Sequence, residues 1–179
     1  MELVRRFLPD APQSYFLFGP RGTGKSTWIK NRYPDALYID LLLPDVFREF
    51  SARPERLSQL IEGQSRTTVI VDEVQKVPQV LPVVHQLIQN KKGLKFILTG
   101  SSARKLKRTG VDLLGGRAVL RTMHPFMAGE LGDGFDFKRA LAEGMLPIVW
   151  RAADPADVLR TYAALYLKEE VQMEGLTRN

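Results

Sequence analysis

The stretch that decides the fold is residues 14–28, SYFLFGPRGTGKSTW. Its apolar segment YFLF, at 15–18, predicts a buried β-strand. The run stops at Gly19, and two further glycines, a lysine and two hydroxyl residues follow before Trp28. The pattern of residues 27–33 is typical of a helix. The stretch therefore predicts a buried strand, a glycine-rich loop and a helix, in that order.

The loop fits the pattern G-x-x-x-x-G-K-[ST] in full. Glycines let consecutive backbone N–H groups turn inward as an anion-binding nest, and the following helix adds its positive N-terminal end. Lys25 would reach the β- and γ-phosphates, the Ser26 hydroxyl would ligate Mg²⁺, and Thr27 would lie beside the α-phosphate. The predicted nucleotide-binding residues are Gly19, Pro20, Arg21, Gly22, Thr23, Gly24, Lys25, Ser26 and Thr27. The alternative is a glycine turn that happens to precede a lysine, but the flanking strand and helix favour a triphosphate site.

A second pattern indicates hydrolysis, because an acid pair follows the apolar strand at 67–71. Asp72 would hold Mg²⁺ through water at the carboxyl end of this strand, beside the phosphate loop. Glu73 would act as general base and polarise the attacking water. A strand that ends in solvated acids is the alternative interpretation.

Strands alternate with helices over most of the chain. Further strands are predicted at 36–40, 95–100 and 117–123, and helices at 44–63 with a break before Pro54, at 80–91 and at 102–108. Strands that are apolar nearly throughout indicate a parallel sheet covered on both faces, so we predict an α/β three-layer sandwich with a five-stranded parallel sheet. After His124 only helical patterns occur, so we predict an α/β core over 1–124 and a partial helical lid over 125–179.

Composition narrows the protein class. The chain has 179 residues, 44% of them hydrophobic and 26% charged, and no cysteine, so disulfides and thiolate metal sites are excluded. No apolar run approaches the roughly 20 residues that cross a bilayer, and the first ten residues lack the apolar core of a signal peptide. We therefore expect a cytoplasmic protein with no membrane contact.

The balance of charge is basic, with a net charge of +6. Such a balance favours polyanionic partners, and residues 103–108, ARKLKR, would be the segment to contact nucleic-acid phosphates. No aromatic residue is interleaved there for base stacking, which favours a solvated helix instead.

Several motifs together resemble the AAA+ ATPases, a class of P-loop NTPases: FLFGPRGTGKST at 16–27, VIVDEVQKVPQVLPVVHQLI at 69–88, KFILTGSSARKL at 95–106, LLGGRAV at 113–119 and HPF at 124–126. More narrowly, they resemble a prokaryotic AAA ATPase family that joins this core to an uncharacterised C-terminal domain. The resemblance covers about residues 1–170. Members of that family are usually much longer, so we expect residues 125–179 to hold the helical lid and the start of a missing C-terminal domain. The chain would then be either a shortened version of such a protein or a natural short form.

The resemblance implies roles for two further residues. Thr99, at the end of the fourth strand, matches the polar residue that senses the γ-phosphate, with Ser101 and Ser102 as near alternatives. The other interpretation is that Thr99 and Ser101 cap the helix at 102–108. Arg117 matches the arginine that reaches a neighbouring subunit's nucleotide in a homo-oligomer; a turn arginine on the surface is the alternative. Arg151 and Arg160 are both candidates for a lid arginine.

Three functions remain open at this point. The first is an ATP-binding, Mg²⁺-dependent AAA+ ATPase that uses Glu73, Thr99 and Arg117 for catalysis and Ser26 and Asp72 for the metal. The second is a nucleotide-binding switch or interaction module with little turnover. The third is a nucleic-acid-binding ATPase. GTP is a poorer candidate than ATP, because the N-K-x-D motif of GTPase families is absent.

Overall fold

The computed structural model describes residues 3–91, 93–103, 106 and 114–167. The chain divides into two compact units. Asp10–Phe18 and Ser26–Thr122 form the first, here called the core unit; Met1–Pro9, Gly19–Lys25 and Met123–Asn179 form the second, here called the helical unit. The domain boundary that the sequence predicts near Pro125 stays a prediction.

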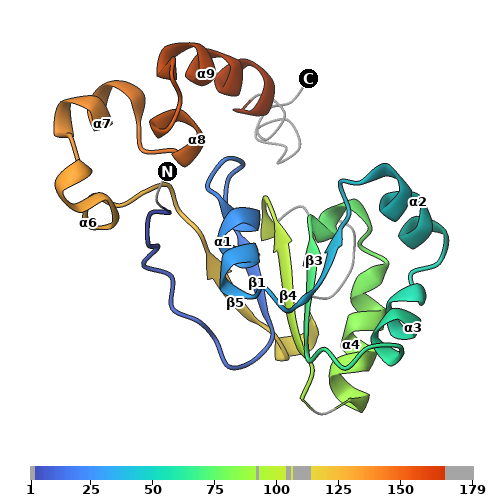
Figure 1. Ribbon diagram of the computed structural model, residues 1–179. Helices are drawn as coiled ribbons and strands as arrows, with labels where there is room; N and C mark the ends of the chain where they lie inside the picture. The colour runs from blue at the N-terminus through green and yellow to red at the C-terminus, as the bar shows by residue number, and fades with distance from the viewer. Residues whose placement is uncertain (1–2, 92, 104–105, 107–113, 168–179) are drawn as a thin grey trace. The chain divides into compact units, whose positions relative to one another are not determined.

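The core unit contains a five-stranded parallel sheet with the order β2-β3-β4-β1-β5 (Figure 1). The strands are β1 (Tyr15–Phe18), β2 (Leu37–Asp40), β3 (Thr68–Asp72), β4 (Lys95–Gly100) and β5 (Val119–Thr122). The helices that alternate with them are α1 (Lys25–Arg32), α2 (Pro44–Ala52), α3 (Arg56–Glu62) and α4 (Val80–Asn90). The predicted α/β three-layer arrangement is confirmed.

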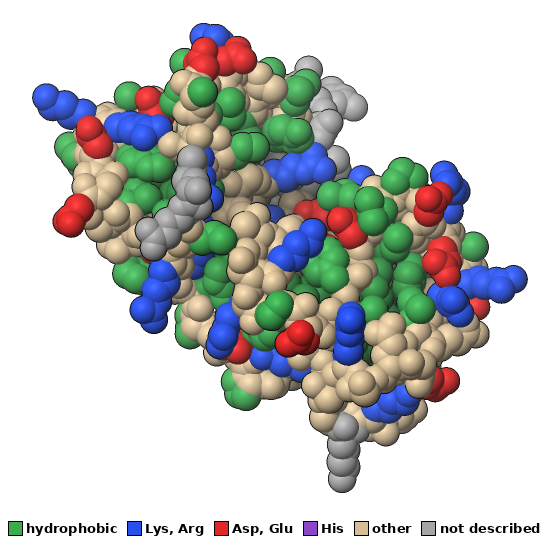
Figure 2. Space-filling model, viewed as in Figure 1, with side chains coloured by type: hydrophobic (Ala, Val, Ile, Leu, Met, Phe, Trp, Pro, Cys, Tyr) green, Lys and Arg blue, Asp and Glu red, His purple; other side chains and the backbone are tan. Residues whose placement is uncertain are grey.

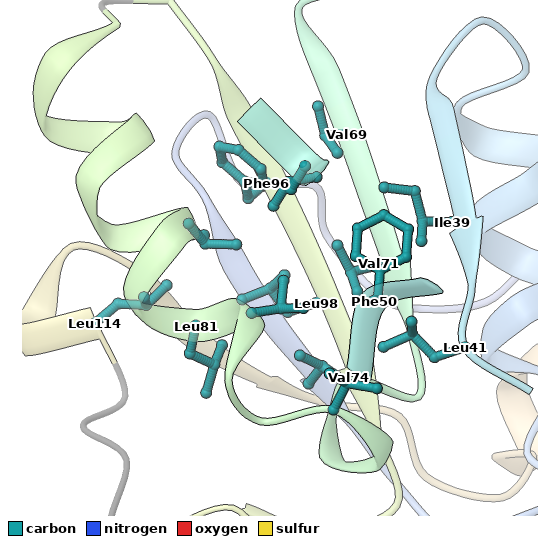
Figure 3. Close-up of a cluster of buried hydrophobic side chains, with 14 of the residues drawn as sticks. Ile39, Leu41, Phe50, Val69, Val71, Val74, Leu81, Phe96, Leu98 and Leu114 are labelled. Carbon is teal, nitrogen blue, oxygen red and sulfur yellow. The ribbon is translucent and has the colours of Figure 1, made fainter. Parts of the chain in front are cut away.

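Helices cover both faces of the sheet. Alternate residues of the strands, such as Val69, Val71 and Leu98, pack with Phe50 of α2 and Leu81 of α4 in one buried cluster (Figure 3). The opposite face carries the other buried strand residues, and α1 covers it (Figure 1). Burial on both faces is the physical reason why these strands are apolar nearly throughout.

Proline sets the helix boundaries of the core unit. Pro44 and Pro82 lie in the first turns of α2 and α4, where a missing N–H costs nothing. Pro54 separates α2 from α3, as the sequence predicts. The basic helix predicted at 102–108 falls largely outside the described residues, which include Ala103 and Leu106 but none of its Lys and Arg residues.

The helical unit contains short helices with local caps. They are α6 (Ala128–Leu131), α7 (Phe137–Glu143), α8 (Pro147–Trp150) and α9 (Pro155–Thr161), followed by a π-helical turn at Tyr162–Leu167. The carboxylate of Asp136 accepts from Arg139 N at the start of α7, and that of Asp154 accepts from Asp157 N at the start of α9. In the part of the chain that the structure describes, no helix combines the length and apolarity needed to span a membrane.

Candidate functional site

The predicted phosphate loop connects β1 to α1 and belongs to the helical unit. Gly22 and Gly24 have φ angles of 77° and 86°. Residues with a side chain rarely adopt this left-handed conformation, so the loop needs glycine at both positions. These angles are what a nest of inward-facing N–H groups requires.

Gly19 is needed for a different reason, which is close approach. A Cβ atom at this position would lie 2.2 Å from the carbonyl oxygen of Met123. That oxygen belongs to the backbone and cannot swing aside. The first glycine of the motif therefore lets the loop pack directly against the segment that follows β5.

The lysine of the motif lies across its own loop. Lys25 is 5% exposed, and its Nζ donates hydrogen bonds to the carbonyl oxygens of Gly19 at 2.7 Å and Pro20 at 3.2 Å. The Thr23 hydroxyl is fully buried and donates to the Pro20 carbonyl at 2.8 Å. The ammonium group is thus held at the loop, which is the position from which it would contact phosphates.

Ser26 and Thr27 occupy the first turn of α1. The Ser26 side chain lies near the Tyr38 hydroxyl on β2, close enough to lower the pKa of that phenol slightly. Thr27 is exposed, and its carbonyl accepts from Asn31 one turn later. Of the two side chains, Ser26 is therefore the one that faces the sheet.

Asp72 ends β3 and is only 2% exposed. Hydroxyls from both neighbouring strands hold its carboxylate: Thr99 of β4 donates to Oδ1 and Tyr38 of β2 donates to Oδ2. Burial and then the hydrogen bond to Asp72 raise the pKa of Tyr38 well above its usual range, so the phenol is a proton donor at neutral pH. The carboxylate is fixed in one orientation.

Glu73 has the left-handed backbone conformation, with φ 59° and ψ 47°, which is uncommon for a residue with a side chain. Its N–H donates to Thr99 Oγ1 at 2.9 Å, and its Oε2 accepts from the Gln75 amide. Strained backbone of this kind persists only where surrounding contacts determine it, and it is concentrated at functional sites.

The core unit thus brings together three of the predicted site residues. Thr99 contacts both Asp72 and Glu73, and Tyr38 donates a further hydrogen bond to Asp72. Arg117 is exposed in the turn before β5, where its N–H donates to Leu114 O at 2.9 Å. Its guanidinium is not part of this cluster.

The lid-arginine candidates have local partners. Arg151 lies over the Phe126 ring, 5.5 Å from its centroid, and Arg160 pairs with Asp157 at 3.2 Å. Neither contact singles out one of them as a nucleotide ligand.

Three residues that hold the site were missed by sequence reasoning: Tyr38, Gln75 and Arg6. Gln75 had a signal, because it follows the acid pair by two residues. Tyr38 had a weaker signal. It lies in a predicted strand, but the sequence alone does not show which strand lies beside it in the sheet. Arg6 had none, because its partner Glu130 is 124 residues away in the chain.

The donor set suits Mg²⁺. Ser26 and Asp72 offer oxygen atoms, the ligand type that Mg²⁺ prefers, and Asp72 is hydrogen-bonded to Tyr38. Within the described residues, no group of three or more His, Asp or Glu side chains is placed to hold a metal ion by itself.

Comparison with protein families gives a match. The sequence profile of a family described as "AAA domain" matches residues 11–132, which is more than half of the chain. No curated protein matches the chain at a significant level. The matched segment includes the glycine loop, the acid pair, Thr99 and Arg117. The chain therefore belongs to the AAA family of ATPases.

Proposed function

We propose that this chain binds ATP and hydrolyses it with Mg²⁺. The observation that carries the proposal is the arrangement around Thr99, whose buried hydroxyl holds Asp72 and the backbone of Glu73 side by side at the ends of β3 and β4. A carboxylate for the metal and a carboxylate for the proton are the two acids that hydrolysis needs. β1, which leads into the phosphate loop, pairs directly with β4, and Leu17 lies opposite Thr99.

The proposal gives each residue one task. The backbone of residues 19–24 and the Lys25 ammonium bind the phosphates, and Thr27 lies beside the α-phosphate. Ser26 and Asp72 hold Mg²⁺, which supplies positive charge to the phosphate oxygens. Glu73 takes a proton from the attacking water. Thr99 is the sensor of the γ-phosphate, and it acts by fixing the positions of Asp72 and Glu73.

Arg117 has a task in this proposal that needs a second copy of the chain. It lies exposed in the turn before β5, where it would reach the nucleotide of a neighbouring subunit and neutralise charge on the γ-phosphate. Turnover per chain would then rise with protein concentration. The nucleic-acid function that the basic charge suggests rests on the Lys and Arg side chains at 104–105 and 107–108, which lie outside the described residues. Figure 2 shows basic side chains scattered among acidic and hydrophobic ones on the face in view.

One observation favours a second candidate, a nucleotide-binding switch with little turnover. The Glu73 carboxylate accepts a hydrogen bond from Gln75, which holds it in place and occupies its Oε2 atom. In this case binding is normal and hydrolysis stays slow until Gln75 releases Glu73.

The test is ATP turnover with Mg²⁺, measured over a range of protein concentrations, together with ADP affinity. We expect Lys25→Ala to lose nucleotide binding, while Lys138→Ala, which removes an exposed lysine, binds as the wild type does. We expect Glu73→Gln to bind normally and to lose turnover by about 10²-fold or more, while Glu55→Gln changes neither. If Lys25→Ala binds like the wild type, the site is wrongly assigned; normal binding without turnover at any concentration supports the switch.

A further inference from the structure

Hydrogen-bond donors outside the phosphate loop hold it in place through its backbone carbonyl groups. Three consecutive residues of the loop each accept a hydrogen bond from a different segment of the helical unit: Arg21 O from the Tyr162 hydroxyl at 3.1 Å, Gly22 O from Ile148 N at 3.3 Å, and Thr23 O from Arg6 Nη1 at 2.8 Å. All six residues belong to the helical unit.

Carbonyl contacts matter in such a loop because N–H and C=O groups of one peptide point in opposite directions. An anion nest needs its N–H groups turned toward the ligand, so the carbonyls face away from it. A donor that holds a carbonyl on the outer side therefore fixes the N–H of the same peptide on the inner side. Loss of that donor would free the peptide to rotate.

Arg6 makes the strongest of these contacts. Its side chain is 8% exposed, and its Nε donates to both oxygens of Glu130, whose side chain is 2% exposed, at 3.1 Å each. Its Nη2 donates to His124 O at 2.5 Å and to Pro125 O at 3.3 Å. A buried charge is tolerated only when it is paired and hydrogen-bonded in this way. The planar fork of arginine supplies these directions at once, and a lysine cannot.

Other contacts fix Arg6 in turn. Glu130 also accepts from Phe7 N at 2.6 Å and from Met127 N at 3.0 Å, so one carboxylate ties the N-terminal segment to the start of α6. The Arg6 guanidinium lies over the Phe126 ring, 5.0 Å from its centroid. The hydrogen bond to Thr23 therefore comes from a guanidinium that cannot easily move.

We propose that Arg6 is a positioning residue of the phosphate loop: through the Thr23 carbonyl it holds the loop in the conformation that binds nucleotide phosphates. The N-terminal segment and α6 are thereby coupled to nucleotide binding. Because the coupling between two sites is reciprocal, bound nucleotide stabilises this arrangement as much as the arrangement stabilises bound nucleotide. The inference rests on the proposed function, since it needs the loop to bind phosphates.

The test compares Arg6→Gln and Arg6→Lys with Arg5→Gln, in which the neighbouring exposed arginine is changed. ADP affinity is measured calorimetrically with Mg²⁺ at a temperature where circular dichroism shows each variant folded. We expect Arg6→Gln to bind ADP about tenfold more weakly or worse, the effect of losing one charge-assisted hydrogen bond to the loop. Arg6→Lys should recover little of this loss, and Arg5→Gln should lie within about twofold of the wild type.

A second variant guards against a merely structural effect of Arg6. Tyr162→Phe removes one hydroxyl from the Arg21 carbonyl and keeps the ring, so it should fold; we expect ADP affinity to fall about threefold. In the double variant the losses should not multiply, because both residues hold one loop. If Arg6→Gln is too unstable to fold, Arg6→Lys and Tyr162→Phe decide.

The outcomes separate the two proposals. If the wild type binds no ADP, the proposed function is wrong and this inference with it. If the wild type binds ADP and folded Arg6 variants bind it as tightly as Arg5→Gln does, Arg6 does not position the loop, although the proposed function stands. A lower melting temperature with unchanged ADP affinity would give Arg6 a purely structural role and also overturn the inference.

Discussion

The Oγ1 atom of Thr99 accepts a hydrogen bond from the backbone N–H of Glu73 at 2.9 Å, while the same hydroxyl donates its proton to Asp72. One buried side chain thus fixes two neighbouring acids of the adjacent strand end. The hydroxyl has a single hydrogen atom, and this atom forms the hydrogen bond to Asp72. In the proposed function, Thr99 would therefore act on hydrolysis by positioning the Asp72 carboxylate and the backbone of Glu73.

Removal of this hydroxyl should affect stability and turnover together. In Thr99→Val the buried N–H of Glu73 loses its acceptor, so we expect the free energy of unfolding to fall by about 1–3 kcal/mol. Turnover of ATP should fall about tenfold or more, since one lost positioning interaction of ~1.4 kcal/mol corresponds to that factor. Urea unfolding and a steady-state ATPase assay measure the two effects.

The matched control is Thr122→Val, which makes the same change at an exposed position of β5 and should leave both quantities nearly unchanged. Thr99→Ser keeps a hydroxyl and should restore most of the turnover. If Thr99→Val hydrolyses ATP at the rate of Thr122→Val, the Thr99 hydroxyl has no role in positioning the acids.

The left-handed backbone of Glu73 gives a second prediction, on the cost of its conformation. Glycine adopts this conformation without strain, whereas any L side chain pays roughly 1–2 kcal/mol for it. We therefore expect Glu73→Gly to be more stable than Glu73→Ala by about 1 kcal/mol, although both lack the carboxylate and neither turns over ATP. Thermal or urea unfolding of the two variants would decide this, and equal stabilities would mean that the position carries no strain.

The fold was predictable because buried strands appear in the sequence as short runs of apolar residues. β1, β3 and β4 are covered on both faces, so each is an apolar run that a strand and little else explains. Pro54 marks the break between α2 and α3 through a steric rule that needs no tertiary context. The glycine loop follows from the same kind of local rule.

The supporting contacts of the site were not predictable, because they depend on which segments become neighbours. Tyr38 reaches Asp72 only because β2 pairs with β3, with Tyr38 opposite Ile70. The left-handed turn at Glu73 reverses the chain so that Gln75 meets the carboxylate. Arg6 precedes the first strand in a segment without any periodic pattern, and its contacts with Glu130 and Thr23 exist only in the folded chain.

Gly19 gives a third prediction, which separates steric fit from general glycine flexibility. In Gly19→Ala the new Cβ would meet the Met123 carbonyl oxygen at 2.2 Å, so the loop or the segment after β5 must shift. We expect loss of ADP binding and a decrease in the unfolding free energy of about 2 kcal/mol or more. Gly134→Ala, where nothing lies within 4 Å of the added Cβ, should bind ADP normally. Wild-type affinity in Gly19→Ala would show that the loop does not need this close approach.

A fourth prediction concerns how the stability of the fold depends on pH. It involves Asp10, which precedes β1 and lies far along the chain from the acid pair. Burial alone would raise the pKa of Asp10, but hydrogen bonds from Tyr33 and Lys95 and the charge of Lys95 outweigh it and hold the pKa below its ordinary value of 3.8. A carboxylate with a lowered pKa in the folded state stabilises the fold when it is ionised. Its contribution is fully present above pH 3.8, the ordinary value, and is lost as the pH falls through the lower folded pKa.

We therefore expect Asp10→Asn to be less stable than the wild type by a constant amount from neutral pH down to about pH 4–5, and the gap to close at lower pH. Urea unfolding of both proteins across this range measures the gap. The exposed Asp35→Asn should stay within about 0.5 kcal/mol of the wild type at neutral pH. A gap for Asp10→Asn that persists unchanged well below pH 3 would contradict the prediction, because it would mean that the ionised carboxylate is not what Tyr33 and Lys95 stabilise.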